Sequence, residues 1–108
     1  MCGASYGAYL AALLVSERPV SRLLLRAPAL ARDKHGRAPA SLASYTGPVL
    51  VVESGGDEVV PKSTIAPYLE ACGGRARQEV IEGATHALTD PRRQQAFIDL
   101  IVDWFKDL

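Results

Sequence analysis

The sequence is poor in the features that mark secreted, membrane and disulfide-rich proteins. It contains two cysteines, Cys2 and Cys72, in 108 residues, which is too few for the disulfide framework of a small secreted domain. We expect free thiols that pack as small hydrophobic side chains, as fits a reducing cytoplasm. The longest nearly apolar run, residues 8–15, is too short to cross a bilayer, and the N-terminus lacks the basic region of a signal peptide. We therefore expect a cytoplasmic protein with no membrane contact.

Neither sign of charge is in excess. Twelve basic and twelve acidic residues give a formal net charge of zero, which removes the long-range attraction to nucleic acids and anionic membranes. The histidine, cysteine and acidic residues lack the spacing of a metal site, and no glycine-rich loop has the spacing that cradles phosphate. These absences predict no cofactor, no metal and no nucleic-acid partner, and they favour a small neutral molecule as substrate.

What the chain does contain is a regular alternation of short apolar runs and helical patterns. With 48% hydrophobic and 22% charged residues, we expect one domain that spans residues 1–108. The expected strands cover residues 20–25, 48–53 and 78–82, and the expected helices cover residues 6–17, 64–72 and 91–108. Residues 27–47 read as a loop with room for a short helix. The alternation predicts an α/β fold, a parallel sheet with flanking helices.

Proline, glycine and capping residues mark the helix ends. Pro19 forbids continuation of the first helix, Ser63 is expected to cap the second, and Gly73 with Gly74 ends it. Asp90 and Pro91 suit the N-cap and first position of the last helix. The first helix is apolar on all faces, which predicts deep burial. The last helix has a single apolar stripe, formed by Phe97, Ile101, Trp104, Phe105 and Leu108.

The run Gly3-Ala4-Ser5-Tyr6-Gly7 is typical of a strained turn that exposes a serine between a strand and a helix and leaves no room for side chains at its two glycines. Asp57 and His86 follow two of the expected strands. Because the carboxyl ends of parallel strands lie at one edge of a sheet, we expect Ser5, Asp57 and His86 to converge. A serine needs a histidine to take its proton, and the histidine needs a carboxylate to orient it.

Three motifs carry a resemblance to the α/β-hydrolase family, in which the triad residues follow in the order serine, acid, histidine. They are Gly-Ala-Ser-Tyr-Gly at residues 3–7, Gly-Asp-Glu-Val-Val-Pro at residues 56–61 and Gly-Ala-Thr-His at residues 83–86. The resemblance covers nearly the whole chain and is closest to the esterase, dienelactone-hydrolase-like and prolyl-oligopeptidase-like branches. It implies Ser5 as nucleophile, His86 as general base and acid, Asp57 as its orienting carboxylate, and the Tyr6 backbone N–H as an oxyanion-hole donor.

The sequence departs from the family pattern in two places. Glu53-Ser54 stands where the family often has His-Gly. The chain also begins at the serine turn, so the resemblance implies a fold that lacks the N-terminal strands and the loop that supplies the second oxyanion donor. The leading interpretation is a serine hydrolase that acts through an acyl-enzyme on esters, with peptides and thioesters as secondary candidates. The alternative is an impaired fragment or a non-catalytic interaction module. An unpaired sheet edge is expected to favour self-association.

Other interpretations stay open at each position. Ser5 would also suit a helix cap, and Asp57 an ordinary turn. Glu58, Glu53 and Asp90 are weaker candidates for the acid. The other histidine, His35, lies in a basic loop and is expected to be solvated, and Cys2 has no base placed to activate its thiol.

Overall fold

A computed structural model of the chain describes residues 1–28, 33 and 36–106. It contains a four-stranded parallel sheet in the order β1-β2-β3-β4. The strands are β1 (Cys2–Ala4), β2 (Leu23–Arg26), β3 (Val49–Ser54) and β4 (Ala76–Ile81). The helices are α1 (Tyr6–Leu14), α2 (Arg37–Ser44), α3 (Ile65–Cys72) and α4 (Pro91–Phe105), with 3₁₀ turns at Lys62–Thr64 and Gly73–Arg75. The predicted α/β fold class is confirmed.

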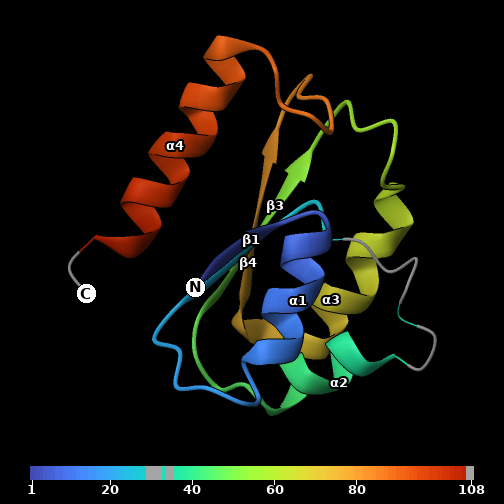
Figure 1. Ribbon diagram of the computed structural model, residues 1–108, viewed down its shortest axis with the longest axis vertical. Coiled ribbons are helices and arrows are strands. Elements are labelled where there is room, and N and C mark those ends of the chain that lie inside the picture. The colour runs from blue at the N-terminus through green and yellow to red at the C-terminus, as the bar shows by residue number, and fades with distance from the viewer. Residues whose placement is uncertain (29–32, 34–35, 107–108) are drawn as a thin grey trace.

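Helices cover both faces of the sheet. Helices α1, α2 and α3 lie on one side and α4 lies on the other (Figure 1). Alternate residues of β2 face the two layers: Leu23 and Leu25 pack with α1–α3, and Leu24 packs with α4. All three leucines have no exposed surface. This two-sided burial explains why β2 reads as a continuous apolar run rather than an alternating one.

The structure adds a strand that the sequence did not predict. Residues 2–4 form β1, which pairs in parallel with β2. Cys2 lies opposite Leu24, and Ala4 lies opposite Arg26. The expected strands did not include one before the serine turn, and β1 corrects that prediction. Strand β2 is therefore paired on both sides, and the edge strands of the described sheet are β1 and β4.

Helix α1 is less buried than its composition predicts. Ala8, Ala11 and Ala12 are buried against the sheet, but Leu10 and Leu14 are 41% and 44% exposed. The small alanines share the face that packs closely on the strands, and the helical period places the two leucines on the opposite face. The prediction of deep burial on all faces of this helix is therefore wrong for the face that carries Leu10 and Leu14. The helix also ends at Leu14, earlier than predicted.

Most of the remaining helix ends lie where the sequence placed them. The carboxylate of Asp90 accepts a hydrogen bond from the Arg92 N–H at the start of α4, and Gly73 ends α3 with φ of 61°. The cap predicted at Ser63 is wrong, because a 3₁₀ turn precedes α3 and Thr64 occupies the N-cap position, where its side chain makes no capping bond. Helix α2 is the short helix that was expected within residues 27–47. Of the α4 stripe, Leu108 lies outside the described residues; its other members pack against the core.

No helix in the described ranges combines the length and the apolar composition that a membrane crossing requires.

We expect the chain to self-associate through the edge strand β1 and the exposed Leu10 and Leu14 of α1, because a free strand edge and exposed leucines each favour pairing with another chain. The double change Leu10→Lys and Leu14→Lys should shift the chain toward the monomer, as measured by light scattering over a concentration series. Val102→Lys is the matched control, since Val102 is 62% exposed but lies on α4, across the sheet. A wild-type chain that stays monomeric at every concentration would contradict this expectation.

Candidate active site

Ser5 occupies a strained turn between β1 and α1. Its φ is 54° and its ψ is −118°, and residues other than glycine rarely adopt a backbone conformation with positive φ. Gly3 makes the turn possible, because a Cβ added there would lie 2.3 Å from the Gly7 carbonyl oxygen. Gly7 itself faces open space, with nothing within 4 Å of such a Cβ. The predicted crowding is therefore confirmed at Gly3 and wrong at Gly7.

The Ser5 side chain points to the histidine loop. Its Oγ lies 2.8 Å from His86 Nε2. Ser5 is the N-cap residue of α1 by position, but its side chain makes no capping bond. The helix-cap interpretation therefore does not describe what the hydroxyl contacts.

Asp57 completes a hydrogen-bonded chain of three side chains. Its Oδ2 lies 2.9 Å from His86 Nδ1, while its Oδ1 accepts the N–H groups of Val59 at 2.8 Å and Val60 at 2.7 Å. An ionised carboxylate can only accept, so Nδ1 of His86 carries a proton and Nε2 is left to accept the Ser5 hydroxyl proton. The Asp57 side chain is 6% exposed and the His86 side chain 19%. The structure thus brings the three predicted residues together.

The surroundings of Asp57 favour its ionised form. Burial acts to raise the pKa of its carboxyl, but the hydrogen bonds from the Val60 N–H, the His86 ring and the Val59 N–H outweigh burial and hold the pKa below its ordinary value. Asp57 is therefore a turn aspartate and the partner of His86 at the same time, one oxygen serving each purpose.

The other candidates for the acid and the nucleophile lie elsewhere. Glu58 is exposed, Glu53 is in β3, and Asp90 pairs with Arg93 at the start of α4. Cys2 is exposed on β1 rather than packed as predicted, whereas Cys72 is buried, and both are free thiols. His35 lies outside the described residues. In the part of the chain that the structure describes, no three histidine, cysteine or acidic side chains are grouped to hold a metal ion.

Sequence reasoning missed Arg26, the last residue of β2, which lies with Ser5, Asp57 and His86 at the carboxyl ends of the strands. Its side chain is buried and donates to the Ser54 hydroxyl at 2.8 Å and to the His86 carbonyl at 3.0 Å. The available signal was a basic residue that ends an otherwise apolar strand, because an arginine is almost never fully buried without partners.

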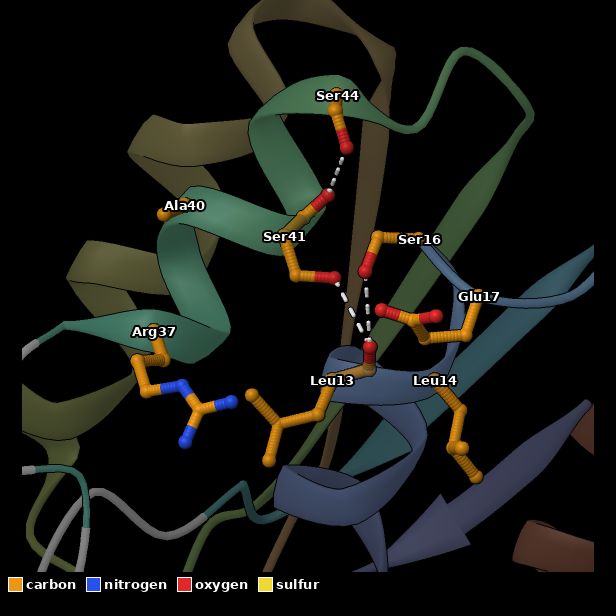
Figure 2. Close-up of a pocket in the computed structure, with 8 residues that line it drawn as sticks. All are labelled: Leu13, Leu14, Ser16, Glu17, Arg37, Ala40, Ser41 and Ser44. Carbon is orange, nitrogen blue, oxygen red and sulfur yellow. Dashed lines mark hydrogen bonds between the residues drawn. The ribbon is translucent and has the colours of Figure 1, made fainter.

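A surface groove of about 470 Å³ lies at the other end of α1. Figure 2 shows its lining: Leu13, Leu14, Ser16, Glu17, Arg37, Ala40, Ser41 and Ser44. The hydroxyls of Ser16 and Ser41 both donate to the Leu13 carbonyl. The Ser41 bond ties α2 to the C-terminal end of α1. Ser5 precedes the N-terminal end of α1, so the groove is separate from the site.

We expect Gly3→Ala to lower the free energy of unfolding by about 1–3 kcal/mol, because the new methyl group has no space beside the Gly7 carbonyl. Gly7→Ala is the matched control. It should change stability little or add up to about 1 kcal/mol, since alanine favours helix over glycine. Urea denaturation of both variants tests this, and equal losses at the two glycines would show that Gly3 is not specifically crowded.

Asp57→Asn should lower the free energy of unfolding by an amount that depends on pH. The folded-state pKa lies below the ordinary value of 3.8, so the unfolded chain binds more protons in the window between the two values. The stabilisation is complete well above pH 3.8 and is lost as the pH falls through the folded-state pKa. The difference in unfolding free energy between wild type and variant should therefore shrink from neutral to acidic pH. A difference independent of pH would contradict the depressed pKa.

Comparison with known proteins gives structural relatives only. No family model matches the sequence, and no curated protein matches it. An esterase domain from Rhodothermus marinus superposes with a TM-score of 0.87 at 13% identity, over 95% of this chain and 57% of the other. A dienelactone hydrolase from Anabaena variabilis gives 0.79 at 27% identity, over 96% and 46%. A serine hydrolase homologue from Coxiella burnetii gives 0.72 at 26% identity, over 94% and 47%.

The chain spans about half the length of these solved structures, yet nearly all of it superposes on them. In this chain, the described residues form a parallel sheet with helices on both faces. The chain therefore has an α/β-hydrolase-like fold.

Proposed function

We propose that this chain carries the catalytic residues of a serine hydrolase that cleaves carboxylic esters through an acyl-enzyme. The observation that carries the proposal is the chain of two hydrogen bonds from Ser5 Oγ to His86 Nε2 and from His86 Nδ1 to Asp57. A hydroxyl, an imidazole and a buried carboxylate in this order are the parts that activate a serine. The esterase, dienelactone hydrolase and serine hydrolase names of the structural neighbours support the same reaction class.

In the proposed acylation step, Ser5 Oγ attacks the ester carbonyl carbon while His86 Nε2 takes its proton. The carbonyl π electrons move to the oxygen, which becomes an oxyanion. As the tetrahedral intermediate collapses, the bond to the alcohol oxygen breaks and His86 returns the proton to the leaving alkoxide. Asp57 stabilises the imidazolium that exists between the two transfers, and its depressed pKa keeps it ionised at neutral pH.

Deacylation repeats these steps with water in place of the serine hydroxyl. His86 takes a proton from water, the resulting hydroxide attacks the acyl carbon, and the ester bond to Ser5 Oγ breaks. The proton then returns to Ser5, which restores the starting state and releases a carboxylic acid.

The N-terminus of α1 is the proposed site of the oxyanion. Tyr6 is the first residue of α1, where backbone N–H groups have no carbonyl partner within the helix and the helix dipole favours negative charge. We propose the Tyr6 N–H as one donor. Each such donor typically contributes about a hundredfold to a thousandfold in turnover.

A second candidate is a non-catalytic interaction module. The observation that favours it is that the chain spans about half the length of its structural neighbours. The two candidates differ in the reactivity of Ser5, because only a serine activated by a base reacts quickly with a fluorophosphonate probe. Labelling of the wild-type chain thus distinguishes an enzyme from a module without requiring turnover.

We expect Ser5→Ala to abolish fluorophosphonate labelling and to lower ester hydrolysis by several orders of magnitude, with a comparable loss of hydrolysis in His86→Ala and a smaller one in Asp57→Asn. The assay is p-nitrophenyl acetate hydrolysis, with Ser63→Ala as a matched control because Ser63 is an exposed serine of the turn before α3. If Ser5→Ala retains most of the activity, the serine-hydrolase proposal fails.

A further inference from the structure

Arg26 places a buried cation among the proposed catalytic residues. It is the last residue of β2 and is 7% exposed. Its guanidinium donates to the Ser54 hydroxyl at 2.8 Å and to the His86 backbone carbonyl at 3.0 Å, and its central carbon lies 5.5 Å from the centre of the Phe97 ring on α4. One side chain therefore contacts the end of β3, the histidine loop and the helix that follows that loop.

The backbone of Arg26 and of its partner Ser54 contacts the other two segments of the site. The Ser5 N–H donates to the Arg26 carbonyl at 2.8 Å, and the Asp57 N–H donates to the Ser54 carbonyl at 3.0 Å. Each of the three proposed catalytic residues is thus one hydrogen bond from Arg26 or from the residue that Arg26 holds.

Stability alone gives no reason for a cation at this position. A buried charge is costly unless it is paired, yet in the described part of the chain Arg26 forms no ion pair with a carboxylate, and its Nε has no hydrogen-bond partner. Burial lowers the pKa of the guanidinium, and the Asp57 carboxylate acts in the opposite direction. An apolar side chain would avoid the cost of the charge but would leave the Ser54 hydroxyl and the His86 carbonyl without these donors. The contribution that is specific to arginine is therefore its pair of hydrogen-bond donors.

The backbone is strained at the same places. Among the described residues, those other than glycine with positive φ are Ser5, Ala27 and Leu88, at 54°, 46° and 54°. Ala27 follows Arg26, and Leu88 lies two residues after His86. Strain of this kind persists only where surrounding contacts over-determine the conformation, and the bond from the Arg26 side chain to the His86 carbonyl supplies such a contact at the histidine loop.

We propose that Arg26 is a positioning residue that sets the location of His86 between Ser5 and Asp57. The inference rests on the serine chemistry proposed above. The planar guanidinium offers donors in a fixed fork, so it holds the Ser54 hydroxyl and the His86 carbonyl at one set spacing. The ends of β2 and β3 are paired in the sheet, and the fork extends this rigid frame to the loop that carries the imidazole.

The test compares Arg26→Gln with wild type in two measurements on the whole chain. The first is the second-order rate of Ser5 labelling by a fluorophosphonate, which should fall by about tenfold to a hundredfold, as displacements of about 1 Å near a reacting group do. The second is the imidazole N–H resonance of His86 in a ¹⁵N-histidine NMR spectrum. The chain has two histidines, and His35→Gln assigns the signal. The Nδ1 proton bonded to Asp57 should give a sharp resonance in wild type and a broadened or absent one in Arg26→Gln.

Arg22→Gln is the matched control. Arg22 precedes the other end of β2 and donates to backbone carbonyls as Arg26 does, at Trp104 and Lys106. Its loss should weaken the attachment of α4 but leave both readouts of the folded protein unchanged. Equal losses of labelling in the two variants would show a general loss of stability and would overturn the positioning role. Wild-type labelling together with an unchanged His86 resonance in Arg26→Gln would also overturn it.

Circular dichroism shows whether Arg26→Gln folds. If it does not, Arg26→Lys is the variant that tests the proposal. Lysine retains the charge but not the fork, so labelling should be slower than in wild type and the resonance broadened; wild-type values in this variant would refute the need for the fork. If wild type itself is not labelled, the serine-hydrolase proposal fails, whereas the His86 resonance still tests the position of the imidazole.

Discussion

The hydrogen bond from the Ser5 N–H to the Arg26 carbonyl is the constraint on which the site depends. It extends the pairing of β1 with β2 by one residue beyond the strand, at the point where the chain must turn into α1. The pairing fixes where the turn occurs, and the absence of a Cβ at Gly3 lets the helix approach closely. Together they hold Ser5 in a conformation that an unsupported backbone would leave.

The parallel sheet brings the segments of the site together. Its four strands end at one edge, so the residues that follow them are neighbours in space although they are distant in the sequence. Asp57 and His86 are held in addition by backbone bonds: the Asp57 carboxylate accepts two N–H groups of its own turn, and the His86 carbonyl accepts from Arg26. The apolar layers on both faces of the sheet make this edge rigid enough to hold three strained residues.

The sequence predicted the features that depend on local patterns and missed those that depend on tertiary packing. Ser5, Asp57 and His86 follow recognisable turns, so their convergence could be inferred. Strand β1 was missed because three residues are too few to show a period, and its pairing depends entirely on β2. The side chain of Arg26 was missed because its partners come from β3, the histidine loop and α4, which no local pattern relates to one another.

The order of the strands has a consequence for how the site comes into being during synthesis. Each strand pairs with the next one along the chain, so each pairing needs only the crossover between two consecutive strands to emerge, and the sheet can add its strands in chain order as the chain leaves the ribosome. The turn at Ser5 can form as soon as β2 is available. His86 follows β4, and α4 must still pack behind it. Under the proposed serine chemistry, a nascent chain therefore holds an unactivated Ser5 until nearly all of these residues have emerged, and the hydroxyl gains its base with the last step of folding.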